Sequence, residues 1–241
     1  MNPRFTVIKT HRIHTQLIRL VLLAVCAAFF SGCATVKQPL TGLVPGRGIT
    51  TVQSSVSLSA SSGERSSAGR GYLVYQAPDL YHLLILSPFG QTMLEAFGES
   101  DRFTCVIPSK QVAFTGLLSE LPAESALKSL QLFRWVMAPP PLPVPGPLRQ
   151  KVEIDGTAYY YDEIGMIERK VAASGDQVRY QGYQSLDGVP FPETIEIRSA
   201  TGGEVRIVFD EPQLNAPVES SSLRPDLSGM AVYPLSEFKV M

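Results

Sequence analysis

Few residues in this sequence combine the types and the spacing that chemistry requires. Acidic residues occur as adjacent pairs, Asp162 and Glu163 in "YDEIG" and Asp210 and Glu211 in "FDEP". Two carboxylates share general acid and base work only when both reach one substrate. Neighbouring residues of a strand point to opposite faces, so neither pair meets that condition. We interpret both pairs as solvated turn residues.

Histidine offers little more. His11 and His14 lie in a segment that we expect to be removed, which leaves His82, in "LYHLLIL", as a residue of a strand face or core. One histidine cannot build a histidine-rich metal site. The sequence also has no G-x-S-x-G, Walker or G-x-G-x-x-G motif. We therefore expect no enzyme activity, no metal and no cofactor.

The N-terminal segment has the pattern of a secretion signal. Residues 1–19 contain four basic residues and no acid, and the eleven residues of "LVLLAVCAAFF" that follow are too few to span a membrane. The next stretch, "FSGC", resembles the lipobox of bacterial lipoproteins, with Phe30 in place of the usual Leu. This resemblance implies a lipoprotein signal peptide over residues 1–32 and acylation of Cys33, for instance by palmitate. The alternative is an ordinary signal peptide, or an uncleaved anchor with a chance cysteine.

Removal of residues 1–32 changes both the charge and the cysteine count. Of 21 Lys and Arg, 17 remain against 22 Asp and Glu, a formal charge of −5 on 209 residues. A mildly acidic chain without a basic run argues against nucleic-acid binding. Cys105, in "RFTCVIP", has no partner for an intramolecular disulfide once Cys33 is acylated. We expect its thiol to be buried and inert, with a reactive thiol as the alternative.

Residues 33–48 have the composition of a tether, and residues 49–241 that of a single domain. The tether contains two prolines, three glycines and no periodicity. A flexible coil of this length reaches on the order of 20 Å, so the domain would work close to the membrane. From Thr50 onward, alternating runs predict about six strands, then a helix, then five or six further strands. One wet and one buried face predict a mainly β fold, with an antiparallel sheet curved over one core.

The expected helix lies between the two groups of strands. Apolar residues at Leu130, Phe133 and Met137 recur at helical spacing, which predicts a helix over residues 120–137. Its last turns are apolar on most sides, as in a helix that is buried or covers an apolar cavity. Six prolines in residues 138–148 predict an extended crossover, with a proline-rich ligand for a partner as the alternative.

The run "YHLLILSPFGQTMLEAF" is apolar on both faces of its strands. Either one face packs on the core while the other meets a ligand, a partner or lipid, or helix and crossover cover both sides. Within this run, "SPFG" has the composition of a tight turn, with Phe89 at its tip. Phe89 either contacts lipid or folds back onto Met93 and Leu86.

Several stretches resemble known lipoprotein families. "LSPFGQTMLE", "GLLSE" and "LKSLQLFRWV" resemble the LolB family of outer-membrane lipoprotein receptors, over about residues 48–148. "YQSLDGVPFPETIEI" and "VFDEPQLNAPV" resemble instead LolA-like lipoprotein families. Both resemblances imply an incomplete antiparallel barrel of about eleven strands, with helices as a lid over an apolar cavity for acyl chains. The LolB resemblance also implies that Phe89 projects from the loop after the third strand and helps lipoproteins pass into the membrane.

These expectations define a candidate site and a function. We expect cavity and lid to be lined by apolar side chains, namely Leu84, Leu86, Met93, Leu94, Phe97, Leu130, Phe133 and Trp135. The protein would be a lipid-anchored monomer on the periplasmic side of a bacterial outer membrane. It would accept lipoprotein cargo by its acyl chains, from a LolA-like donor, and insert it into the membrane. The alternatives are a carrier or sensor for another lipid or hydrophobic ligand, and a structural lipoprotein of the envelope.

Overall fold

The described part of the chain contains one β-sheet. The computed structural model describes residues 40–44, 47–63, 65–121, 130, 132–141 and 149–238. The strands all lie in one compact unit, residues 39–241. The predicted signal peptide and Cys33 lie outside the described residues, as do most of the predicted tether and of the proline-rich crossover.

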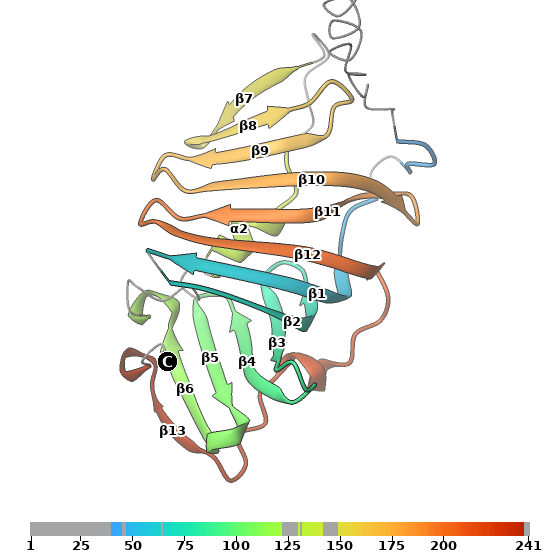
Figure 1. The fold of residues 1–241 in the computed structure, drawn as a ribbon. Helices are drawn as coiled ribbons and strands as arrows, with labels where there is room; N and C mark the ends of the chain where they lie inside the picture. The colour runs from blue at the N-terminus through green and yellow to red at the C-terminus, as the bar shows by residue number, and fades with distance from the viewer. Residues whose placement is uncertain are drawn as a thin grey trace, which may run out of the picture. The chain divides into compact units, whose positions relative to one another are not determined.

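Thirteen strands form this sheet, in the order β13-β6-β5-β4-β3-β2-β1-β12-β11-β10-β9-β8-β7 (Figure 1). Their bounds are β1 Thr51–Ser62, β2 Arg65–Gln76, β3 Leu80–Leu86, β4 Thr92–Glu99, β5 Arg102–Ile107, β6 Val112–Leu117, β7 Gln150–Ile154, β8 Thr157–Tyr161, β9 Ile167–Ala172, β10 Gln177–Leu186, β11 Val189–Arg198, β12 Gly203–Leu214 and β13 Ala231–Pro234. Neighbouring strands are antiparallel, except that β13 runs parallel to β6. The strands β13 and β7 are the two edges, so the sheet is open.

The mainly β fold is therefore confirmed, but the expected number of about eleven strands is wrong. All six strands expected before the helix are present as β1 to β6, and β7 to β12 follow it. The additional strand β13 returns to pair with β6, and each of its four residues is exposed. A strand without a buried face lacks the alternation on which the sequence prediction depended.

Two of the hairpins have Asp-Gly turns with the backbone conformation that these residues favour. Asp155 and Gly156 connect β7 to β8 with φ of 48° and 71°, and Asp187 and Gly188 connect β10 to β11 with φ of 49° and 80°. Positive φ at both central residues defines the type I′ turn, which suits the twist of a two-residue hairpin. The turn positions that these Asp-Gly dipeptides predict are therefore confirmed.

Within the described residues, the predicted helix is only partly α-helical. Residues Leu118–Glu120 form a 3-10 turn, η3, in which the Glu120 carboxylate accepts a hydrogen bond from the Leu117 backbone N–H at 3.1 Å. Within the described residues, the α-helical part is α2, Phe133–Met137, and residues 122–129 and 131 lie outside them. The α-helix predicted to begin at residue 120 is wrong at that end. A lid of helices is not confirmed.

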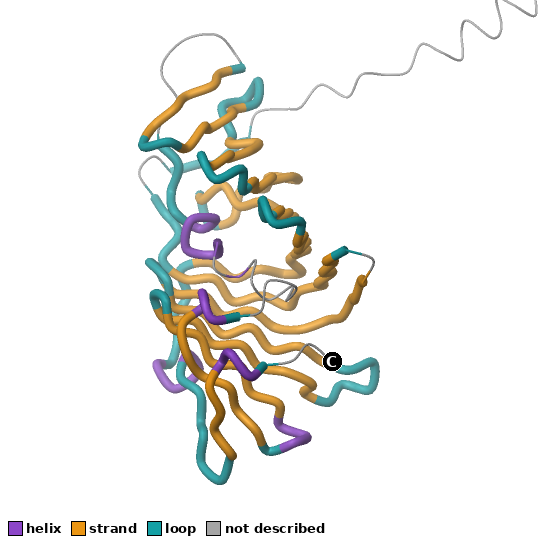
Figure 2. The backbone as a smooth tube through the Cα atoms, turned by 90° about the vertical axis from the view of Figure 1, so that its left-hand side faces the viewer, coloured by secondary structure: helices purple, strands orange, loops and turns teal. Residues whose placement is uncertain are grey.

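The sheet curls around α2. Phe133 packs against Tyr81 of β3 with ring centroids 5.0 Å apart, while Lys170 of β9 hydrogen-bonds the carbonyl of Ala138, just after α2, at 2.7 Å. The strands β3 and β9 are six spacings apart in the sheet, about 29 Å if it were flat at about 4.8 Å per strand. Five helical residues cannot bridge that distance, so the sheet must curl, as Figure 2 shows. We call the face that contacts α2 the inner face and the opposite one the outer face.

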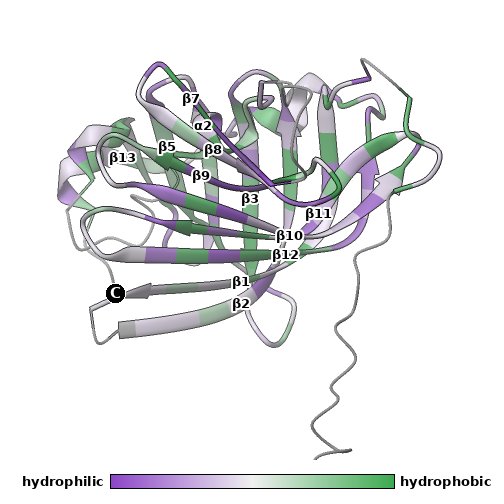
Figure 3. Ribbon diagram, turned by 90° about the horizontal axis from the view of Figure 1, so that it is seen from above, coloured by the Kyte–Doolittle hydropathy of each residue, from purple (hydrophilic) through white to green (hydrophobic). Residues whose placement is uncertain are grey.

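The two faces differ in polarity. Buried apolar side chains of the inner face include Val56 of β1, Leu73 of β2 and Ile207 of β12, which belong to one continuous core. On the outer face the same strands carry polar residues, such as Ser57 of β1 and Arg206 of β12, both exposed. Figure 3 shows this alternation along β12. The alternation follows from the period of two in a strand with one buried face.

Candidate functional site

The eight residues predicted to line a cavity do not share one face of the sheet. Leu94 of β4 pairs with Ile85 and belongs to the inner core, which also includes Leu130, Phe133 and Trp135. The other four have the opposite parity and lie on the outer face, namely Leu84, Leu86, Met93 and Phe97. Phe97 belongs there to a second, smaller cluster with Val106 and Ala113. The single cavity lined by all eight residues is therefore wrong as a set.

Aromatic side chains hold α2 on the inner face. Phe133 is 1% exposed and lies between Tyr75 of β2 and Tyr81 of β3, with ring centroids 5.7 and 5.0 Å away. Val136, one turn further on, is 2% exposed. The apolar surface that the sequence assigns to acyl chains is thus occupied in part by the chain's own helix.

A buried lysine fastens the end of α2 to the other half of the sheet. Lys170 of β9 is 1% exposed. Its Nζ donates hydrogen bonds to the backbone carbonyls of Trp135, Val136 and Ala138, at 3.0, 3.1 and 2.7 Å. Tyr180 of β10 donates a further bond of 2.6 Å to the Val136 carbonyl. These are the carbonyls that a helix leaves unpaired at its C-terminus, where a cation is also favoured by the helix dipole.

Burial sets the protonation of this lysine. Desolvation lowers the pKa of Lys170 from 10.5 to about 7. The side chain also lies near two aromatic rings, with Nζ 5.9 Å from the centre of Trp135 and 5.5 Å from that of Tyr180. Desolvation likewise raises the pKa of the Tyr180 hydroxyl well above its ordinary value. The sequence prediction missed Lys170, because carbonyl partners on a remote helix leave no pattern around "ERKVA".

Among the described residues, two buried polar groups in or beside α2 have no hydrogen-bond partner. They are the Trp135 indole N–H and the Tyr81 hydroxyl. Buried donors without partners cost free energy, so such groups are natural points for a polar atom of a ligand to bind. Tyr81 fits under the helix because Gly98 of β4 lies opposite it, and a Cβ on Gly98 would come within 2.1 Å of the Tyr81 ring.

The C-terminal segment, residues 215–230, covers part of the outer face. Its residues Leu227 and Met230 pack on the cluster of Phe97, Val106 and Ala113. Its Ser222 carbonyl lies 2.9 Å from Nδ1 of His82, whose Nε2 lies 3.0 Å from a carboxylate oxygen of Glu95. The His82 ring also stacks on Phe97 at 4.0 Å. His82 is therefore a residue of the strand face, as expected, and it holds the C-terminal segment.

The Phe89 side chain is exposed to solvent at the tip of the β3–β4 hairpin. The turn is closed by bonds from the Gly90 N–H to the Ser87 carbonyl at 2.9 Å and from the Ser87 N–H to the Gln91 carbonyl at 2.8 Å. The Ser87 hydroxyl accepts two further N–H groups of the turn, from Phe89 and Gln91. These bonds fix the backbone, and the Phe89 side chain is 92% exposed. The alternative in which Phe89 folds back onto Met93 and Leu86 is wrong.

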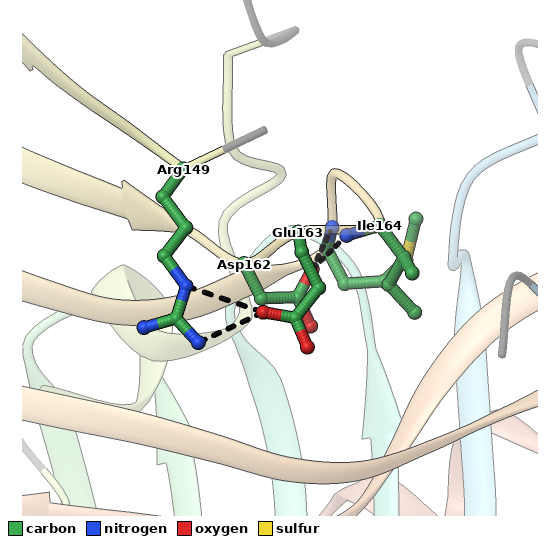
Figure 4. A network of polar contacts seen from close by, with 5 residues as sticks. Arg149, Asp162, Glu163 and Ile164 are labelled. Atoms are coloured by element: carbon green, nitrogen blue, oxygen red, sulfur yellow. Dashed lines mark hydrogen bonds and ion pairs between the residues drawn. The ribbon is translucent and has the colours of Figure 1, made fainter. Parts of the chain in front are cut away.

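The acidic pairs do not form a shared site. Asp162 is buried, and its carboxylate accepts the backbone N–H groups of Ile164 and Met166 at 3.0 and 2.9 Å. Glu163 instead pairs with Arg149, with its oxygen 2.8 Å from Nη2 (Figure 4). The solvated position predicted for Asp162 is therefore wrong, since this residue is buried and closes the β8–β9 turn from within. Asp210 and Glu211 are exposed as predicted, but they lie in strand β12 and not in a turn.

The described residues include a buried thiol but neither a cluster of metal-binding side chains nor a helix able to span a membrane. Cys105 is fully buried, which confirms the predicted burial, and desolvation raises the pKa of its thiol to about 12. That the thiol is inert stays a prediction. Among the described residues, no three His, Cys, Asp or Glu side chains gather as a metal site would require. In the same part of the chain, no helix is both long and apolar enough to cross a membrane.

Comparisons with solved structures find chains that are similar only at low identity. A LolA superfamily protein from Nitrosomonas europaea is 13% identical, with a TM-score of 0.46, over 76% of this chain and 92% of that one. A DUF1329 family protein from Desulfovibrio piger is 10% identical, with a TM-score of 0.48, over 73% and 92%. A domain described as an outer membrane lipoprotein-sorting protein, from Vibrio parahaemolyticus, is 11% identical, with a TM-score of 0.44, over 73% and 90%.

Sequence comparison gives the family. No curated protein matches the chain. The family model for the outer membrane lipoprotein LolB matches residues 50–211, which is well over half of the chain. The match begins just before β1 and ends within β12. It includes most of the C-terminal stretches that resemble LolA-like families. The chain therefore belongs to the LolB family of outer membrane lipoproteins.

Proposed function

We propose that this protein accepts lipoproteins by their acyl chains and inserts them into the outer membrane. Cys33 carries the lipid anchor, the domain faces the periplasm as a monomer, and a LolA-like protein delivers the cargo. Membership of the LolB family supports the handling of outer-membrane lipoproteins. The single observation that supports insertion is the Phe89 side chain, 92% exposed at the end of a hairpin whose backbone is fixed.

The proposed transfer needs no covalent step. An acyl chain moves toward the environment that buries more of it, and each buried methylene contributes about 0.8 kcal/mol. The inner face supplies apolar side chains around α2, and α2 must shift if a chain is to lie beneath it, because Phe133 and Val136 are buried. The unpartnered Trp135 N–H lies in the same place and suits a carbonyl oxygen of the cargo.

A reconstituted transfer assay tests insertion. A purified LolA-like donor, loaded with a radiolabelled lipoprotein, is mixed with vesicles that carry the acylated protein, and label in the vesicles is measured. Phe89→Glu should leave the fold unchanged, since the side chain is exposed, yet should reduce transfer at least tenfold. Val232→Glu, at a second exposed apolar position, is the matched control and should transfer normally. Normal transfer by Phe89→Glu would refute the role of the hairpin tip.

Native mass spectrometry of protein from its own envelope tests the cargo. Co-purified acylated peptide supports lipoprotein transfer. Co-purified lipid without peptide would favour the alternative of a carrier for another hydrophobic ligand. An empty inner face in every preparation would contradict both and leave the structural lipoprotein.

A further inference from the structure

The outer face of β2, β3 and β4 has an apolar surface next to the Phe89 hairpin. Tyr72 of β2 pairs with Leu84 of β3, and Leu86 follows two residues on. Leu86 pairs with Thr92, and Met93 is the extra residue at the β-bulge between this pair and Ile85–Leu94. Tyr72 and Met93 are 40% and 54% exposed, and Leu84 and Leu86 are partly exposed. We call Tyr72, Leu84, Leu86 and Met93 the outer patch.

The chain's own covering ends beside this patch. Leu227 and Met230 bury Phe97 on the neighbouring part of the same face, and Ser222 contacts His82. This segment leaves the side chains of the outer patch exposed or partly exposed. An apolar surface that continues beyond its cover is typical of an interaction site.

Cations border the outer patch. Arg70 of β2 lies directly opposite Leu86 and is exposed. Lys110 is exposed in the 3-10 turn η2, Pro108–Lys110, which packs next to β4. Among the described residues, Glu95 also lies on this face, opposite Leu84, where its carboxylate contacts His82 at 3.0 Å. Two cationic side chains, Arg70 and Lys110, therefore flank the patch, although the mature chain is acidic overall.

The shape of this surface favours a bilayer as its occupant. Small ligands bind in concave sites, whereas the outer patch lies on the outside of a curled sheet and continues into the protruding Phe89. An apolar surface with an aromatic residue and a cationic border is the arrangement that lies at a membrane interface, where basic residues meet anionic headgroups. We infer that the outer patch docks on a bilayer containing anionic phospholipid, so that β2 to β4 lie flat on the membrane. This inference rests on the proposed function, because it extends the Phe89 contact to a whole face.

Tryptophan reporters test the docked orientation. The chain has one tryptophan, Trp135, so Trp135→Phe provides a background in which single reporters are read. In that background, Tyr72→Trp, Met93→Trp, Phe89→Trp and Val232→Trp are made in the full acylated protein, and circular dichroism checks each fold. The vesicles contain phosphatidylcholine and phosphatidylglycerol with brominated acyl chains, which quench tryptophan on contact.

The expected result is strong quenching at positions 72, 89 and 93 and none at position 232, which lies on the edge strand β13. Replacement of phosphatidylglycerol by phosphatidylcholine, or Arg70→Gln with Lys110→Gln, should at least halve the quenching at position 93. Quenching at 89 without quenching at 72 and 93 would overturn the inference and leave the proposed function intact. No quenching at 89 would overturn both. If quenching changes neither with the lipid charge nor with the two substitutions, the inference that the patch binds anionic headgroups is wrong.

Discussion

Lys170 and Ala138 are joined by a hydrogen bond of 2.7 Å between Nζ and the backbone carbonyl, across 32 residues of sequence. The bond belongs to a set of three through which the Lys170 side chain holds the end of α2. It connects the helix to β9, while Phe133 connects the same helix to β3. The position of α2, and with it access to the inner face, therefore depends on contacts from both halves of the sheet.

Replacement of this lysine should destabilise the protein. Lys170→Met keeps most of the apolar side chain but leaves helix carbonyls without donors, and an unsatisfied buried group costs about 1–3 kcal/mol. We expect a loss of about 2 kcal/mol in the free energy of unfolding, measured by urea denaturation. Lys151→Met on β7, where the side chain is 53% exposed, is the control and should change little. Equal stability of the two variants would show that Lys170 does not fasten α2.

The same residue should make stability depend on pH. Its pKa is about 7 when folded and 10.5 when exposed, so between these values the unfolded chain binds the extra proton. The free energy of unfolding should therefore rise with pH from about 7 to about 10, by on the order of 1 kcal/mol per pH unit. Lys170→Met should lack this contribution, and the difference between the two proteins isolates it. If the difference in unfolding free energy between the two proteins does not change from pH 7 to 10, the hydrogen bonds to the helix carbonyls keep Lys170 protonated in the folded state.

Much of the fold is predictable from the sequence, because its strands have one buried face and Asp-Gly turns. The failures have local causes. β13 is held by backbone pairing to β6, including a bond from the Ala231 N–H to the Gln111 carbonyl at 2.9 Å, and no side-chain pattern announces it. The predicted start of the helix fails because Glu120 closes a 3-10 turn with its own carboxylate.

The candidate site was only partly predictable. The exposed tip at Phe89 follows from turn composition, since Ser, Pro and Gly leave Phe89 as the residue that points out. The strand period alone would have separated Leu94 from Met93, because successive residues face opposite sides. Lys170 could not be found, since its carbonyl partners belong to a helix that is distant in sequence.

The packing of Tyr81 depends on a glycine. A Cβ at position 98 would lie 2.1 Å from the Tyr81 ring, which is 4% exposed and packs on Phe133. Gly98→Ala must therefore displace the ring, and overpacking of this kind costs about 1–3 kcal/mol. The free energy of unfolding should fall by that amount. Gly69→Ala is the matched control in a strand, because its Cβ would meet Ile85 at an ordinary 3.5 Å. Similar losses in both variants would point to strand propensity instead of the ring.

The thiol of Cys105 should be unreactive in the folded protein. It is fully buried, and burial raises its pKa to about 12, so almost no thiolate forms at pH 8. With the signal peptide removed and Cys33 acylated, as proposed above, a chromogenic disulfide reagent should react with less than a tenth of one equivalent of thiol within minutes. Addition of urea should then expose one thiol per chain. Rapid reaction without urea would show that the inner face opens around β5 far more often than its burial implies.

His82 should control the C-terminal segment. His82→Phe keeps a ring to stack on Phe97 but removes the contacts to the Ser222 carbonyl at 2.9 Å and to Glu95 at 3.0 Å. We expect faster amide hydrogen exchange in residues 219–230, because the segment loses its anchor on β3, and unchanged exchange in β10 to β12, which it does not cover. Ser57→Ala, at an exposed position of β1, should change neither region. Unchanged exchange in residues 219–230 would mean that Leu227 and Met230 alone hold the segment.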